Sequence, residues 1–190
     1  MPAPPPIPMR LAHRPTRNGL VVPYVSMTGT DGTAYLGQTR GKAVAECVVN
    51  YRCQICGRPL DRTRPLLFLV TQQVIDEAFS TEPALHPECA AYSIKACPMV
   101  AGRMRTYAKH QADLAGRPCD DPECGCDGIV STANGLAGQA APAWFRAWYR
   151  DYAVGIADAT IGLTVGNITG CGLIGEPVQI RPIATGGSFL

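Results

Sequence analysis

The stretch CQICG at residues 53–57, together with HPEC at residues 86–89, decides the fold of this chain. Two residues between the first two cysteines allow both thiolates to point at one metal ion, and Gly57 permits the positive-φ turn that follows them. Pro87 suits the first position of a helix, so His86 takes the cap position and the next cysteine lies three residues further on the same helical face. The sequence therefore predicts a zinc ion held by Cys53, Cys56, His86 and Cys89.

Around these ligands the sequence predicts an α+β fold, with a treble-clef-like zinc module and a β-rich C-terminal part. A treble clef consists of a knuckle, a β-hairpin and a helix that carries ligands in its first turn. The 29 residues between the two ligand pairs have room for a hairpin that contains the apolar stretch 66–71. The expected parts are a proline-rich arm (1–20), an α+β region (21–105) with the zinc module at about 45–105, a cysteine-rich loop (106–128) and a β-rich part (129–190).

Further elements are expected from periodicity and from turn residues. A helix over 84–97 ends before Pro98, because proline cannot continue a helix. The dipeptide Asp31-Gly32 is typical of a turn between two strands. The other predicted elements are strands at 21–26 and 33–36, a helix at 39–50, a sheet-forming segment at 143–154 and a strand at 178–183.

Composition excludes several classes of protein. The net charge is only +2 and charged residues make up 17% of the chain, which is too little for a protein that coats DNA. The longest strongly apolar run, at 65–70, is far shorter than the roughly 20 residues that cross a bilayer, so we expect no membrane partner. The N-terminus has no signal-peptide pattern, and we expect a cytoplasmic protein. Nine cysteines then indicate metal ligands or buried thiols instead of disulfides.

Three segments carry a family resemblance: RCQICGRPL, TEPALHPECAAYSIKACPMVAGRM and GRPCDDPECGC. They resemble an uncharacterised family of small CxxC…HxxC zinc-binding proteins encoded by actinobacteria and their phages and mobile elements. The similarity covers roughly residues 10–128. It implies a metal role for the same four ligands and an intracellular location, and it implies no particular activity.

A second pattern competes for His86. The run His86-Pro87-Glu88, followed by Pro118-Cys119 and then Cys124, approximates the signature of zinc deaminases, in which the glutamate shuttles protons. Four residues separate the two cysteines where deaminases have two, and one histidine cannot serve two zinc ions. A deaminase-like hydrolase that uses Glu88 is therefore the alternative to a closed structural site.

Three further cysteines, Cys119, Cys124 and Cys126, lie within eight residues and offer ligands for a second metal ion. The alternative is a turn-rich loop with reduced thiols. A fourth ligand would come from Cys47, Cys97, Cys171 or His110. In a continuous helix Cys97 lies roughly 12 Å beyond Cys89, so it is expected to be a core thiol and not a ligand of the first ion.

Basic residues follow the expected zinc helix, and we select Arg103, Arg105 and Lys109 as candidates for phosphate contacts with a nucleic acid. The alternative is an ordinary solvated face. Together these observations predict a non-catalytic zinc-binding protein that acts as a regulator or accessory factor on a macromolecule, more specifically a nucleic acid. A third hypothesis is a structural component of a phage or other assembly, in which the proline-rich arm and the glycine-rich C-terminus pack on neighbours.

Overall fold

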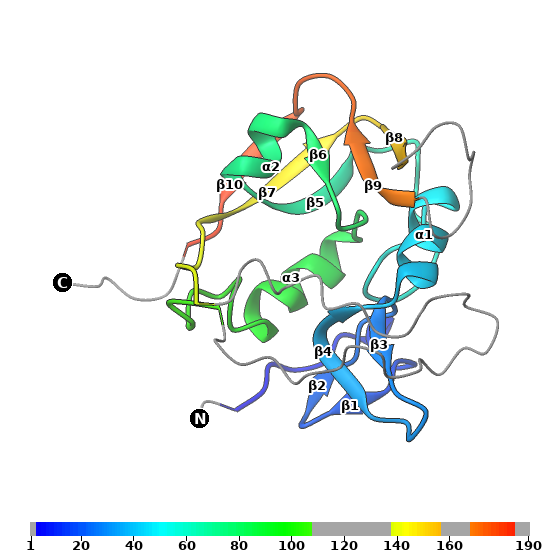
Figure 1. Ribbon diagram of the computed structural model, residues 1–190, viewed down its shortest axis with the longest axis vertical. Coiled ribbons are helices and arrows are strands. Elements are labelled where there is room, and N and C mark those ends of the chain that lie inside the picture. The colour runs from blue at the N-terminus through cyan, green and yellow to red at the C-terminus, as the bar shows by residue number, and fades with distance from the viewer. Residues whose placement is uncertain (1–2, 108–137, 157–167, 185–190) are drawn as a thin grey trace.

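The computed structural model describes residues 3–107, 138–156 and 168–184 of the chain (Figure 1). These residues combine helices with several small antiparallel sheets, as expected. In chain order the elements are the 3-10 helix η1 (Met9–Leu11), β1 (Thr16–Arg17), β2 (Leu20–Val21), β3 (Ser26–Thr28), β4 (Ala34–Thr39), α1 (Gly41–Val49), β5 (Leu66–Thr71), α2 (Gln72–Glu77), β6 (Phe79–Ser80), α3 (Pro87–Ala96), β7 (Trp144–Tyr149), β8 (Tyr152–Ile156), β9 (Ile168–Leu173) and β10 (Gln179–Pro182).

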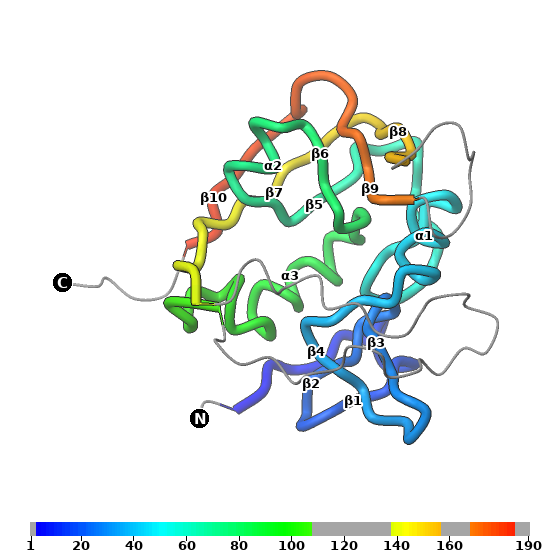
Figure 2. Tube along the Cα trace, viewed as in Figure 1, coloured from blue at the N-terminus to red at the C-terminus, as the bar shows by residue number. Residues whose placement is uncertain are grey.

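Two three-stranded sheets and two short hairpins hold these elements together. The larger sheets have the strand orders β10-β7-β5 and β6-β9-β8, and the hairpins pair β1 with β2 and β3 with β4. Figure 2 shows the two hairpins at the end of the molecule opposite the larger sheets. The strand expected at 66–71 is confirmed as β5, and it pairs with β7 along its whole length.

The strand β5 is apolar throughout because both of its faces are covered. Side chains alternate along a strand, so Leu67 and Leu69 face one side while Phe68 and Val70 face the other. The first pair belongs to the core around α3 and the ligand cysteines, and the second pair belongs to a separate core with Tyr149 and its neighbours. One strand thus separates two hydrophobic cores, and the candidate metal site lies in the first.

The helix expected at 84–97 is present as α3, with His86 as its N-cap and Pro87 in its first turn. Figure 1 shows α3 lying beneath the β10-β7-β5 sheet. The hydroxyl of Tyr92, buried on α3, accepts a hydrogen bond of 2.9 Å from the backbone N–H of Val21. This contact attaches the N-terminal hairpin to the helix that carries two of the expected ligands.

The hairpin expected between the two ligand pairs is replaced by a different arrangement. The strand β5 pairs with β7, and β6 pairs with β9. The chain returns to β5 through one isolated bridge, in which Leu85 N–H donates to Leu67 O at 2.8 Å. The helix α2, which the sequence analysis missed, causes this difference. The Thr71 hydroxyl caps the start of α2. Ala78, in the left-handed conformation (φ 49°), ends α2 and redirects the chain toward β9.

Part of the proline-rich segment at 1–20 packs into the body of the protein. Leu11 is completely buried in the same core as the ligand cysteines, and the β1-β2 hairpin follows it. The predicted helix at 39–50 corresponds to α1, and the predicted turn at Asp31 joins β3 to β4. In the described residues, no helix has the length and apolar character that a membrane crossing requires.

Candidate metal centre

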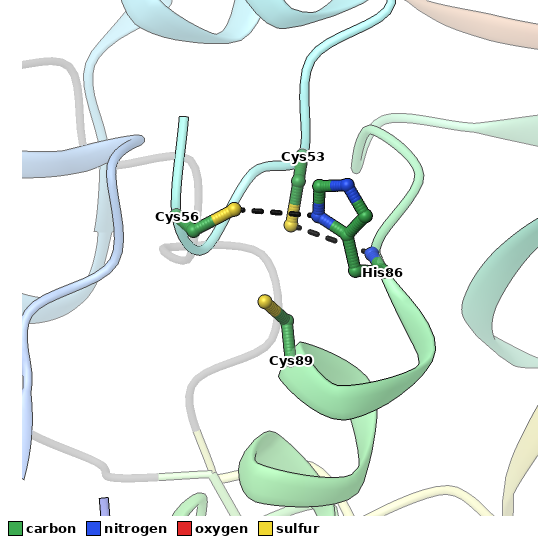
Figure 3. A group of neighbouring side chains, drawn as sticks. All are labelled: Cys53, Cys56, His86 and Cys89. Carbon is green, nitrogen blue, oxygen red and sulfur yellow. Dashed lines mark hydrogen bonds between the residues drawn. The ribbon is translucent and has the colours of Figure 1, made fainter. Parts of the chain in front are cut away.

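The structure brings the four predicted ligands together. Figure 3 shows the side chains of Cys53, Cys56, His86 and Cys89 converging from the knuckle and from the first turn of α3. Their ligand atoms all lie within 4.8 Å of one another. Thiolates bind zinc at about 2.3 Å, which places two sulfurs of one tetrahedral site about 4 Å apart. The spacing therefore fits one ion held by three sulfurs and one nitrogen.

The chain reaches the knuckle through a left-handed residue at the end of α1. Tyr51 has a φ of 48°, and its position is fixed by a hydrogen bond of 2.8 Å from its hydroxyl to Asp151 and by stacking on Tyr152. The knuckle itself is a tight loop, in which Cys53 N–H donates to Arg58 O at 2.9 Å and Gly57 N–H donates to Cys53 O at 2.8 Å. These backbone hydrogen bonds hold the knuckle in the tight turn that carries Cys53 and Cys56.

Gly57 is required at the knuckle for two reasons. Its φ is 72°, and a Cβ atom there would lie 2.6 Å from the Tyr24 ring. That ring cannot easily move, because the Tyr24 hydroxyl donates to Glu46 at 2.6 Å.

We expect Gly57→Ala to lower the free energy of unfolding by about 3 kcal/mol, the sum of a strained backbone and an overpacked contact. Thermal unfolding measures this loss. Gly175→Ala is the matched control, since Gly175 has a φ of 70° and no atom within 4 Å of the added methyl group. For Gly175→Ala we expect the free energy of unfolding to fall by about 1 kcal/mol. Equal losses in the two variants would show that the Tyr24 contact has no role.

The imidazole of His86 is oriented for metal binding. Its Nδ1 lies 3.3 Å from the Cys56 sulfur, while its Nε2 lies 3.0 Å from the backbone oxygen of Pro59. A carbonyl oxygen accepts only from N–H, so Nε2 carries a proton, and Nδ1 is the ring nitrogen that faces the sulfurs and can bind a metal once its own proton is displaced. Metal-binding histidines are commonly fixed by such a contact to the distal nitrogen. The donor set therefore fits a zinc ion in its chemistry as well as in its spacing.

The electrostatics of the site favour a cation. Hydrogen bonds from the Cys53 and Cys89 thiols hold the pKa of Cys56 far below its ordinary value, while hydrogen bonds to Cys53 and Cys56 raise the pKa of Cys89. Hydrogen bonds to Cys53 and Cys56 raise the pKa of His86 to about 10. The cluster thus concentrates negative charge and attracts a proton to His86. A metal ion that replaces this proton must compete with it, so affinity falls at low pH.

The site is enclosed by protein. The three cysteines are buried, and His86 is half-buried. Leu11 packs among them, and His13 Nε2 lies 3.0 Å from the backbone oxygen of Cys56. Sequence reasoning did not associate Leu11, His13 or Pro59 with the site. No local pattern indicates these contacts, because Leu11 and His13 precede the knuckle by about 40 residues.

The other cysteines behave differently from the four ligands. Burial raises the pKa of Cys47 to about 12 and also raises the pKa of Cys171, as expected of apolar core thiols. Cys97 caps the end of α3 and packs at the margin of the core. Among the described residues, the Cys53 group alone has a spacing suited to a metal. The suggested second-metal cysteines, Cys119, Cys124 and Cys126, lie outside the described residues.

The predicted phosphate-binding residues are placed in part. Arg103 is exposed, and its guanidinium donates to Lys95 O at 2.9 Å and to Ala96 O at 3.1 Å, so it caps the last turn of α3. Arg105 is exposed on the segment that follows. Lys109 lies outside the described residues. Glu88 is exposed and forms an ion pair of 3.5 Å with Arg10, outside the ligand cluster.

Comparisons of the chain with protein-family models, with curated proteins and with solved structures each found no match. The assignment of the candidate metal site therefore depends on the geometry of its four residues alone.

Proposed function

We propose that this protein is a non-catalytic zinc-binding protein, in which a treble-clef-like zinc module, with β5, α2 and β6 in place of the usual hairpin, holds together a body that recognises a nucleic acid as a regulator or accessory factor. The observation that supports a non-catalytic zinc site is the closed set of four candidate side-chain ligands, whose ligand atoms lie within 4.8 Å of one another. Catalytic zinc sites keep one position for water or substrate, whereas structural sites fill all four positions with protein atoms. Reduced thiol ligands also suit the cytoplasm.

The site geometry disfavours the deaminase alternative. His86 directs Nδ1 toward Cys56, so it is not available to a second ion with Cys119 and Cys124. Glu88 pairs with Arg10 at the surface, where it has no access to a water on the enclosed metal. A proton shuttle needs hydrogen-bond reach to the reacting group. A structural role for the zinc is therefore the better interpretation.

The nucleic-acid part of the proposal is supported by exposed cationic side chains near the zinc module. Arg17, Arg58 and Arg105 are exposed, and Arg58 belongs to the knuckle loop. Phosphate contacts of this kind provide affinity that does not depend on sequence. The net charge of +2 is consistent with binding at a limited surface and not with coating of the nucleic acid.

Titration of the zinc-loaded protein with labelled single-stranded and duplex oligonucleotides at several salt concentrations tests this proposal. We expect binding at low salt that weakens steeply, with a log–log slope of roughly 0.9 for each duplex phosphate contacted or 0.7 for each single-strand phosphate. Absence of binding to every DNA and RNA probe at low salt would contradict the nucleic-acid role. Self-association seen in a size measurement under the same conditions would then favour the assembly hypothesis.

A further inference from the structure

One face of the β10-β7-β5 sheet carries a group of aromatic and basic side chains. Alternation along β7 places Trp144, Arg146 and Trp148 on the same face. The register sets Arg181 of β10 opposite Arg146, and Gln179 opposite Trp148. We call these five residues the Trp-Arg face. The same face continues onto β5 as Leu67 and Leu69, which are buried beside α3, whereas Gln179 and Arg181 are exposed on β10.

The charges on this face are not compensated within the described residues. Arg146 and Arg181 are directly opposite each other on neighbouring strands, and like charges in that position destabilise a sheet. Neither guanidinium has a carboxylate partner in the part of the chain that the structure describes. The Nε of Arg146 and the Nε1 of Trp144 are buried and have no hydrogen-bond partner among the described residues. Buried donors that lack a partner are costly to the folded state.

The two tryptophans of this face are half-buried, because they pack against the core around α3, and the Trp148 ring therefore has a defined position. The guanidinium of Arg181 lies 5.9 Å from the centre of the Trp148 ring. With the Gln179 amide oxygen turned toward Arg181, that oxygen accepts from Nε at 3.1 Å and from Nη2 at 2.9 Å. Arg181 is therefore held beside Trp148 by a neutral partner, and its positive charge is not cancelled.

The chain around Arg105, one of the basic residues that the sequence analysis selected, pairs with the segment just before β7. The backbone oxygen of Arg105 accepts a hydrogen bond of 2.8 Å from Ala141 N–H, three residues before Trp144. Thr106 and Ala140 form a bridge in the same region. The chain thus brings Arg105 to the start of β7, so a ligand on the Trp-Arg face can extend toward it.

We propose that the Trp-Arg face binds single-stranded nucleic acid, with a backbone phosphate between Arg146 and Arg181 and a base stacked on the indole of Trp148. This inference rests on the proposed function and assigns its surface. Arginines that track phosphates, combined with aromatic rings that stack on unpaired bases, are the usual features of single-strand recognition. A duplex does not expose base faces for stacking, so single strands are preferred.

Tryptophan fluorescence reports directly on this face, because Trp144 and Trp148 are the two tryptophans of the chain. We expect oligo-deoxythymidine or oligo-uridine of about ten nucleotides to quench the emission as it binds, since a stacked base quenches an indole. The two probes distinguish DNA from RNA as the preferred ligand. A base-free polyanion such as polyphosphate serves as the control for charge alone. Equal affinity for polyphosphate without quenching would overturn the stacking part of the proposal.

Substitutions then locate the surface. Arg181→Gln is expected to lower the log–log salt slope by about 0.7, and the double variant Arg146→Gln with Arg181→Gln by about 1.4. Trp148→Leu is expected to weaken binding at least about fivefold, the lower limit for one stacked base. Arg64→Gln is the matched control, because Arg64 is 83% exposed on the loop before β5, where it pairs with Asp61, and its loss changes the net charge equally.

The outcomes separate this inference from the proposed function. If the unsubstituted protein binds single strands while the arginine variants keep its affinity and salt slope, the Trp-Arg face is wrong and nucleic-acid binding stands. Failure of the unsubstituted protein to bind any probe would overturn both. Should the double variant not fold, quenching in the unsubstituted protein still decides. Binding without any change in emission would overturn the inference.

Discussion

Replacing Cys89 with serine is expected to abolish zinc binding and to unfold the part of the protein around α3. Cys89 is completely buried in the first turn of α3, and its sulfur is one of four ligand atoms that converge. In zinc-finger peptides the binding of structural zinc contributes about 10–16 kcal/mol, and this binding energy is folding energy. Elemental analysis measures the zinc, and thermal unfolding measures the stability.

The second hydrophobic core limits how much of the folded structure is lost in the Cys89→Ser variant. Phe68, Tyr149 and Cys171 pack together on the far side of β5 and include none of the ligands. This core is expected to persist when the zinc is lost, so the variant keeps part of its secondary structure. Cys97→Ser is the matched control, since Cys97 lies outside the ligand group on the same helix. It is expected to retain the ion. Protein that is purified without a chelator and contains no zinc would contradict the assignment.

The grouping of the four candidate ligands was predictable because each pair is specified locally. Two residues between Cys53 and Cys56 and the glycine that follows determine a knuckle, and Pro87 determines where α3 begins. For the two pairs to converge, the chain between them only had to bring His86 and Cys89 back to the knuckle. That return was predicted correctly, although the path was not: α2 and β6 occupy the place of the expected hairpin.

Sheet pairing was less predictable, because it depends on contacts distant in sequence. The apolar run of β5 indicates a strand buried on both faces, but nothing in it selects β7 as its partner. The strand β9, with the sequence ITGCGL, was missed since two glycines interrupt any alternation of apolar residues. Leu11 was assigned to an arm for a similar reason: the proline-rich sequence around it is typical of extended chain, and its burial depends on the ligand cysteines.

The glycines that interrupt the apolar pattern of β9 allow a neighbouring backbone to approach this strand closely. A Cβ atom on Gly170 would lie 2.2 Å from the backbone oxygen of Ser80 and 2.9 Å from Cα of Thr81. Ser80 belongs to β6, which pairs with β9. The two backbones therefore approach closely enough to exclude any side chain, and they hold the segment that leads to His86.

Gly170→Ala is accordingly expected to lower the free energy of unfolding by about 3 kcal/mol, because the atoms in conflict belong to the backbone and rotation of a side chain cannot relieve the contact. The melting temperature would fall by about 6–12 °C for a chain of this size. Displacement of the segment before His86 is also expected to accelerate transfer of zinc to a chromogenic chelator. Gly172→Ala is the matched control on the same strand, since its nearest contacts would be ordinary ones of 3.8 and 3.9 Å. A small, equal change in both variants would show that the approach of β6 to β9 does not support the metal site.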